Sequence, residues 1–178
     1  QDYYNEDLLY KMFGINAELL IDHAWGYEPV TMDLIKSYRP ETNCISSGQV
    51  LHCAMDFTKT KIIVREMAEQ LAMDLMAKKL VTDQIVLTVG YDIDNLKIPE
   101  IADHYHGEIT VDRYGRSVPK HAHGTGNLTT MTASLSKITE TTMGLYERIV
   151  NPSLLTRRIT LTANHLKDAD KVKDEPVY

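Results

Sequence analysis

Two amphipathic helical segments, each lying between β-rich segments, constrain the fold of this chain more than any other feature. In residues 58–80, apolar side chains recur at three- and four-residue steps from Ile63 to Leu75, which predicts a helix with one buried face. Residues 134–150 carry the same pattern. Helices of this kind need an apolar surface to pack against, and a sheet built from the flanking segments provides it.

The flanking segments have the alternation and the β-branched composition of strands. They are residues 44–54, 84–91, 125–132 and 155–164. The resulting order β-α-β-β-α-β predicts an α+β fold of the ferredoxin-like, split βαβ type, in which a four-stranded antiparallel sheet carries both helices on one face. Residues 92–120 are polar and rich in Asp, His and Gly, and we expect them to form a long, irregular excursion.

The second face of this sheet has no helices, so the side chains that point to it matter for function. If the apolar residues of each strand point inward, their neighbours point outward. The outward set that this alternation predicts is Ser47, Gln49, Thr88, Thr125, Asn127, Thr129, Arg158, Thr160 and Thr162. Hydroxyls, amides and one guanidinium without a carboxylate, together with backbone N–H groups near Gly48 and Gly126, suit phosphate oxygens. Threonine-rich faces are also common on half-exposed sheets, so an ordinary solvated surface is the alternative.

The charge of the chain permits nucleic-acid binding without favouring it. The net charge is −6, which taken alone argues against such a ligand. Residues 105–165, however, carry 7 basic and 4 acidic side chains, together with four histidines. Because affinity for DNA follows the local field and not the sum, the acidic remainder of the chain does not exclude a DNA-binding surface.

Cysteine usage and hydropathy point to the cytoplasm. No apolar run reaches the roughly 18 residues of a membrane span, and no signal-peptide pattern opens the chain. Cys44 and Cys53 provide no disulfide framework, so a reducing compartment is the simpler assumption, and no membrane partner is expected. The chain begins with Gln1 and stops at Tyr178 within a polar tail, and we therefore expect a piece of a longer protein.

Histidines provide a metalloenzyme hypothesis. His104, His106, His121 and His123 could supply metal ligands, but nothing in the sequence brings the two pairs together. Residues 92–95 resemble the opening of a calcium loop that lacks its glycine and its terminal glutamate. The chain has neither a G-x-S-x-G motif nor a Gly-rich phosphate loop, so we predict no catalytic residue and no metal site in it. The glycines that follow His123 are expected to form a turn before the third strand.

Two motifs near the N-terminus and four motifs along the predicted strands resemble a known family. The N-terminal motifs are FGINA at residues 13–17 and HAWGYEP at residues 23–29. The strand motifs are SSGQVL at 46–51, TDQIVLTVGY at 82–91, HGTGNL at 123–128 and LLTRRI at 154–159. In this order they resemble the end of the thumb and the little-finger domain of Y-family translesion DNA polymerases, in the UmuC/DinB-like (ImpB/MucB/SamB) branch of Gram-positive bacteria. The resemblance covers nearly the whole chain.

The resemblance implies a division of the chain into four parts. They are the end of a helical thumb at 1–29, a linker at 30–43, the DNA-binding little finger at 44–166 and a polar tail at 167–178.

The resemblance also implies a function in DNA repair, in which the little finger holds the primer–template duplex by contacts to its backbone. Carried over by position, these contacts involve Ser47, Gly48, Gln49, Asn127, Thr129 and Arg158. Relatives often have a basic residue at the position of Gln49, so the affinity of this chain for isolated DNA is expected to be weak. The catalytic carboxylates and their Mg²⁺ ions belong to palm segments, so the chain alone is expected to be inactive and without a cofactor. A sliding clamp is an expected partner of the parent polymerase.

A protein-interaction module is the alternative from a different functional class. Such a module docks a partner, for example a sliding clamp, through its sheet face or a strand edge, and the acidic net charge favours it. Salt separates the two hypotheses, because neutralising phosphates makes DNA binding fall steeply as salt rises.

Overall fold

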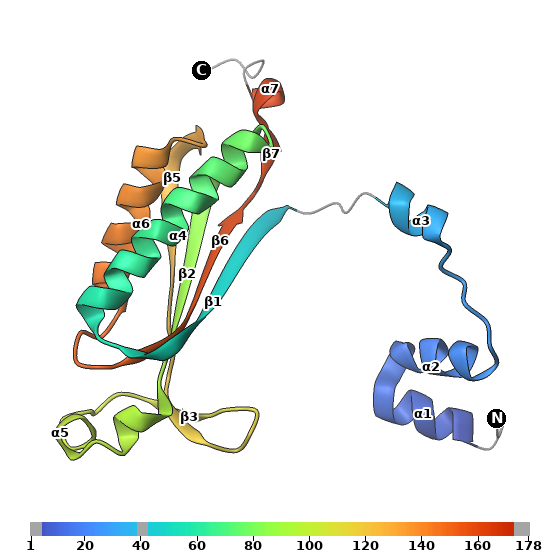
Figure 1. The fold of residues 1–178 in the computed structure, drawn as a ribbon, viewed down its shortest axis with the longest axis horizontal. Helices are drawn as coiled ribbons and strands as arrows, with labels where there is room; N and C mark the ends of the chain where they lie inside the picture. Colours follow the sequence, from blue (N-terminus) through green and yellow to red (C-terminus); the bar gives the residue numbers. More distant parts are fainter. Residues whose placement is uncertain (1–4, 39–42, 173–178) are drawn as a thin grey trace. The chain divides into compact units, whose positions relative to one another are not determined.

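The computed structural model describes residues 5–38 and 43–172, which fall into two units (Figure 1). The helical unit comprises Gln1–Glu41 and the sheet unit comprises Thr42–Tyr178.

The helical unit contains four short helical segments. They are α1 (Glu6–Phe13), the 3-10 turn η2 (Gly14–Asn16), α2 (Ala17–Ala24) and α3 (Met32–Ser37). The first three lie where the end of a helical thumb was predicted, whereas α3 lies inside the predicted linker. The hydroxyl of Thr31 accepts a hydrogen bond from the backbone N–H of Leu34, and this N-cap explains why a helix begins there. Residues 39–42 of the predicted linker lie outside the described residues.

The helical unit does not enclose a core of its own. Ala17 is its only fully buried side chain among residues 5–38. Met12, Ile15 and Tyr27 expose 63%, 79% and 60% of their surface. Short helices of this kind, with few buried apolar contacts, are only marginally stable in isolation.

The sheet unit confirms the predicted α+β fold. Its main elements are β1 (Cys44–Met55), α4 (Phe57–Ala77), β2 (Leu80–Tyr91), β5 (Ala122–Thr132), α6 (Leu135–Ile149) and β6 (Thr156–Asn164). The four strands are antiparallel to their neighbours and are arranged in the order β1-β6-β2-β5. Both α4 and α6 pack on the same face of this sheet (Figure 1).

The strand order interleaves two split βαβ units. Strands β1 and β2, joined by α4, flank β6, while β5 and β6, joined by α6, flank β2. The strand that closes each unit is therefore central, and the strand that opens it lies at an edge. In the ferredoxin sheet the opening strands are central, so centre and edge are exchanged in this chain. The ferredoxin-like prediction is therefore confirmed for the connectivity and the layers, whereas the strand order differs.

The core lies between the sheet and the two helices. Leu71 and Leu75 of α4 and Leu145 of α6 are buried against the apolar side of β2 and β6. Tyr146 is completely buried, and its hydroxyl donates a hydrogen bond of 2.9 Å to the backbone oxygen of Phe57. In the described part of the chain, no helix combines the length and the apolar character that a membrane span requires.

Two glycines allow α6 to approach the edge strand β5 closely. A Cβ atom at Gly126 would lie 2.7 Å from Cγ2 of Thr141, and one at Gly124 would lie 2.9 Å from Cγ2 of Ile149. Both glycines lie within β5, which begins at Ala122. The prediction that they form a turn before the strand is therefore wrong, and they serve close packing instead.

Residues 92–120 are more ordered than their composition predicted. They contain η3 (Ile93–Leu96), α5 (Pro99–Ala102) and a hairpin of β3 (Ile109–Val111) and β4 (Ser117–Pro119). The buried amide of Asn95 fixes the start of this excursion to the chain before β6: its nitrogen donates to the backbone oxygens of Asp92 and Leu155, and its oxygen accepts from the N–H of Leu155. The order therefore comes from hydrogen bonds that composition does not report.

The beginning of the predicted polar tail also has structure. Strand β7 (Lys167–Asp168) pairs with the first residues of β2, and the short helix α7 (Ala169–Val172) follows it. The remaining residues of the predicted tail, 173–178, lie outside the described residues.

Candidate functional site

The face of the sheet opposite α4 and α6, called here the open face, carries most of the predicted outward residues. Because residues directly opposite each other on antiparallel strands point to the same face, register assigns each side chain. Thr88 of β2 lies opposite Thr160 of β6 and His123 of β5, and none of the three packs in the apolar core. Register also places Thr125, Asn127, Arg158 and Thr162 on this face, and alternation with Leu128, which packs against the core, adds Thr129.

Two predicted contact residues lie on the other face. Ser47 pairs with Leu161 and Gln49 pairs with Ile159, and both partners are fully buried under the helices. Ser47 and Gln49 therefore point to the helix side, where they are exposed because β1 is an edge strand. The sequence could not reveal this, since most of β1 is exposed on both faces and shows no apolar alternation. Because Gln49 points to the helix side, a basic residue at this position would not add charge to the open face.

On β1, the residues that alternate with Ser47 and Gln49 point to the open face. Ser46, Gly48 and Val50 lie opposite Thr162, Thr160 and Arg158. Of the residues predicted on this strand, only Gly48 lies on the open face, where its backbone is next to the Thr160 hydroxyl.

Polar side chains of the open face bond to one another across the strands. The amide of Gln84 donates to Asn127 at 3.2 Å and accepts from Asn164 at 3.0 Å, so three strands share one chain of amides. Elsewhere Ser46 bonds to Thr162, and Thr88 bonds to Nδ1 of His123. These bonds hold donors and acceptors in fixed positions, which is what a surface for an extended polar ligand requires.

Arg158 is the one arginine of the open face in the described residues. Its neighbours across the sheet are Val50 and Gly90, which do not compete for its guanidinium. It forms no ion pair within the described part of the chain. An exposed guanidinium without a carboxylate partner is suited to a phosphate or another anion.

A β-bulge brings a second arginine to the same region. Gly90 pairs with Arg158 and Tyr91 with Thr156, so Arg157 is an extra residue on β6. Strict alternation would separate Arg157 and Arg158, but the irregular backbone allows both side chains to line one groove. The Nε atom of Arg157 lies 3.8 Å from the carboxylate of Asp92.

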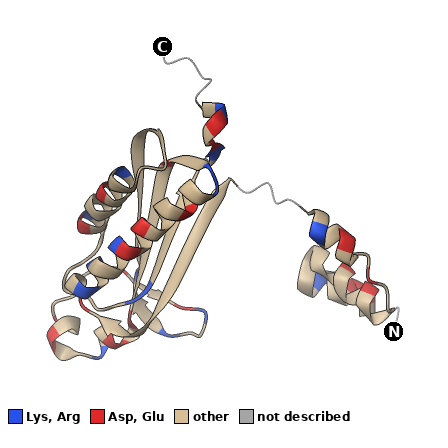
Figure 2. Cartoon of the chain, turned by 45° about the horizontal axis from the view of Figure 1, so that its top comes forward, with Lys and Arg blue, Asp and Glu red and all other residues tan. Residues whose placement is uncertain are grey.

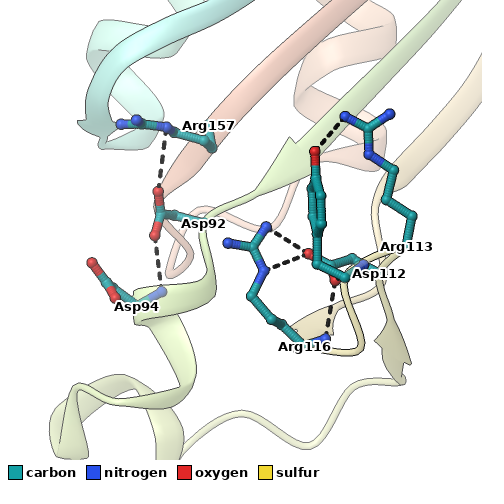
Figure 3. A network of polar contacts seen from close by, with 7 residues as sticks. Asp92, Asp94, Asp112, Arg113, Arg116 and Arg157 are labelled. Carbon is teal, nitrogen blue, oxygen red and sulfur yellow. Dashed lines mark hydrogen bonds and ion pairs between the residues drawn. The ribbon is translucent and has the colours of Figure 1, made fainter.

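The β3–β4 hairpin supplies two further arginines to this groove, shown in Figure 3. The Asp112 carboxylate accepts hydrogen bonds from the Arg116 side chain and from the backbone N–H groups of Arg116 and Tyr114. These bonds, those of the Arg116 side chain foremost, hold the pKa of Asp112 below its usual range, so that it stays ionised and fixes the turn. The Tyr114 ring has the guanidinium carbon of Arg113 at 4.7 Å and that of Arg116 at 5.0 Å from its centroid.

We call this concavity the arginine groove; it has a volume of about 830 Å³ and lies between the hairpin and one end of the open face. Its charged lining is Arg113, Arg116, Arg157, Arg158, Asp92, Asp94 and Asp112. The four arginines outnumber the three aspartates. Figure 2 shows the long strands of the sheet almost free of charged residues, which lie mainly on the helices and on the segments at the two ends of the sheet.

The metal-ligand hypothesis finds no support in the geometry. Within the described residues, no three His, Cys, Asp or Glu side chains lie together in a way that could hold a metal ion. His121 and His123 are neighbours, with ring centroids 6.4 Å apart, while His104 bonds to the backbone oxygen of Glu100.

The arginine groove was missed in the sequence because its members come from separate segments. One signal for the hairpin was present: Asp112-Arg113-Tyr114-Gly115-Arg116 lies between β-branched residues, as in a tight turn. Gly115 has a φ of +76°, the left-handed conformation that this turn requires. No comparable signal marked Arg157, because a bulge is visible only in the pairing of the strands.

No protein-family model and no curated protein matches this chain.

Proposed function

We propose that this chain is the little-finger domain, with the end of the thumb, of a bacterial Y-family DNA polymerase that acts in translesion synthesis and DNA repair. Its function in this proposal is to hold the primer–template duplex by contacts to the DNA backbone. The observation that carries the proposal is the open face, which presents hydroxyls, amides and Arg158, a guanidinium without an ion pair among the described residues. Register places no carboxylate of the described strands there.

The positions of the family-like motifs support the same proposal. Residues 46–51 lie in β1, residues 82–91 in β2, residues 123–128 in β5 and residues 154–159 at the start of β6. These are the first, second, third and fourth strands of the main sheet in chain order, as the resemblance implied. The helices α4 and α6 lie between the motifs where the family has its helices.

In this proposal the chain performs no chemistry. Nucleotide addition, with its Mg²⁺ ions, belongs to a palm domain of the parent polymerase, and the open face positions the duplex for it. The parent works on chromosomal DNA in the cytoplasm and is held there by a sliding clamp. The exposed apolar residues of the helical unit fit a thumb, because the rest of that domain would cover them.

A fluorescence-anisotropy titration of this chain with a primer–template duplex, at two salt concentrations, tests the proposal. We expect weak binding that ignores base sequence and falls steeply as salt rises, because each neutralised phosphate releases counterions. A closed-circular competitor DNA of unrelated sequence should displace the labelled duplex equally well. Absence of salt-dependent binding would contradict the proposal.

The protein-interaction alternative retains one specific observation in its favour. Strand β1 is 12 residues long and lies at the edge of the sheet, and no other strand of the described part pairs with its outer side. At the opposite edge, Arg148 donates a hydrogen bond to the backbone oxygen of Thr125 and so occupies one acceptor of β5. An unprotected edge of this length can accept a peptide as an additional strand. Binding of a sliding clamp that resists salt, together with no binding of DNA, would favour this function.

A further inference from the structure

We propose that the arginine groove is a second binding site for the nucleic-acid backbone, beside the open face. The inference rests on the proposed function in that DNA is the ligand, and it assigns a role to the β3–β4 hairpin that neither the resemblance nor the open face provides. The ligand chemistry is a sugar–phosphate strand, bound mainly through guanidinium–phosphate contacts.

The distribution of ion pairs shows which arginines are available. Asp112 is bound by Arg116, Asp94 is bound by Lys97 at 2.8 Å, and Asp92 lies beside Arg157. Every carboxylate of the groove thus has a cation. Arg113 and Arg158 form no ion pair in the part of the chain that the structure describes, and both line the groove, one from the hairpin and one from the sheet.

The hairpin holds Arg113 in a defined position. The Arg113 guanidinium lies over the Tyr114 ring and also donates a hydrogen bond of 2.6 Å to the Tyr114 hydroxyl. Arg116 approaches the same ring and is tied to Asp112 by its side chain. A guanidinium whose rotamers are already restricted loses less entropy when it binds a phosphate, so this arrangement favours binding.

The open face contributes few cations to the electrostatic part of duplex binding. Arg158 is its one arginine in the described residues, and most of its remaining polar groups are neutral hydroxyls and amides. The electrostatic part of DNA binding comes from Lys and Arg beside phosphates. At the end of this face the groove adds Arg113, which has no ion pair among the described residues, beside Arg116 and Arg157, whose charges are partly balanced by Asp112 and Asp92. The bulge at Arg157 allows two consecutive arginines to line the groove.

The groove is therefore suited to a strand that leaves the open face and continues past the hairpin. Two sources have the same chemistry: one strand of the paired duplex, or the unpaired template extension beyond it. Tyr114 exposes 66% of its surface, and its ring lies close to the guanidinium groups of Arg113 and Arg116. Its position is therefore compatible with a strand from either source.

The test compares Arg113→Ala, Arg113→Lys and the unchanged chain by anisotropy over a range of salt. One probe is a blunt duplex and the second is the same duplex with a single-stranded 5′ extension. We expect Arg113→Ala to weaken binding by about tenfold at low salt and to lower the slope of log K against log salt by about 1, while Arg113→Lys keeps the slope. Lys137→Ala, which removes one charge from α6 on the helix side, is the matched control and should keep the slope.

The two probes separate the sources. A loss with both probes identifies a strand of the paired duplex, and a loss confined to the extended probe identifies the unpaired template. An unchanged slope in Arg113→Ala with both probes, while the unchanged chain binds DNA, would overturn the second site and leave the proposed function standing. No salt-dependent binding of the unchanged chain would contradict both.

Discussion

At the scale of single residues, Arg158 provides the clearest link between geometry and function. It is the arginine that sequence alternation and strand register both place on the open face, and it has no carboxylate partner among the described residues. We expect Arg158→Ala to weaken duplex binding about equally for all base sequences, because a phosphate contact carries no sequence information. The slope of log K against log salt should fall by about 1. A slope equal to that of the unchanged chain in the same titration would show that Arg158 contacts no phosphate.

Because of Tyr146, the stability of the sheet unit is expected to fall as the pH rises into the alkaline range. Burial raises the pKa of its phenol above the ordinary value of 10.0, because the phenolate is disfavoured inside the core. Below about pH 10 this phenol is protonated in both the folded and the unfolded state, so its contribution to the free energy of unfolding is fully present. Above that pH the unfolded state loses its proton first, so the free energy of unfolding falls by up to about 1.4 kcal/mol per pH unit from this residue.

Tyr146→Phe isolates this effect. At neutral pH the variant should be less stable by about 1 kcal/mol, because the hydrogen bond to Phe57 is lost. As the pH rises above about 10, the unchanged chain should lose this advantage, since phenylalanine does not titrate. Urea unfolding followed by circular dichroism at several pH values measures the difference, in which the other tyrosines cancel. A constant difference between pH 8 and 11, about 1 kcal/mol throughout, would contradict the argument.

Sequence alternation predicted the faces of residues only where buried and exposed side chains alternate. In β2 and β6 the apolar series that includes Leu87 and Leu161 marked the core side, so Thr88 and Arg158 were assigned correctly. In β1 that signal is absent, and Ser47 was assigned to the wrong face. Arg157 shows a different limit, because a bulge depends on how two strands pair and not on either strand alone.

At the scale of elements, the contact between β5 and α6 depends on glycine. The Cβ atom introduced by Gly126→Ala would meet the Thr141 side chain at 2.7 Å, closer than packed atoms can approach. We expect this variant to lower the free energy of unfolding by about 1–3 kcal/mol, because α6 must shift away from the sheet. Thermal or urea unfolding of the purified variant measures this change.

Gly144, which lies within α6, provides the control for this substitution. A Cβ atom there meets nothing within 4 Å, so Gly144→Ala should stabilise the helix by about 0.5–1 kcal/mol. The two substitutions thus have opposite predicted signs. Equal effects of both would contradict the close-packing explanation.

The regular elements of the sheet unit could be predicted because each has its own periodic signal. The helices and main strands occur where apolar periodicity placed them, with ends that differ by a few residues. The excursion of residues 92–120 could not be predicted in the same way. Its order depends on the Asn95 amide and the Asp112 carboxylate, which bond to backbone groups that any sequence provides and, for Asp112, also to the Arg116 side chain.

At the scale of the whole molecule, the chain combines a sheet unit with a complete core and a helical unit without one. Tyr146, Leu161 and their buried neighbours form the core of the sheet unit, whereas Ala17 is the only buried residue among the described residues of the helical unit. The proposed function therefore rests on the sheet unit, whose open face binds DNA in that proposal.

Two adjacent serines of β1 allow the most direct test of this claim. Ser46 lies on the open face opposite Thr162, and Ser47 lies on the helix side opposite Leu161. Both are exposed, so Ser46→Asp and Ser47→Asp add the same charge to the same strand on opposite faces. We expect Ser46→Asp to weaken duplex binding by about tenfold in a low-salt anisotropy titration, because like charges repel, and Ser47→Asp to change it little. Equal binding by both variants, or a larger loss in Ser47→Asp, would contradict DNA binding by the open face.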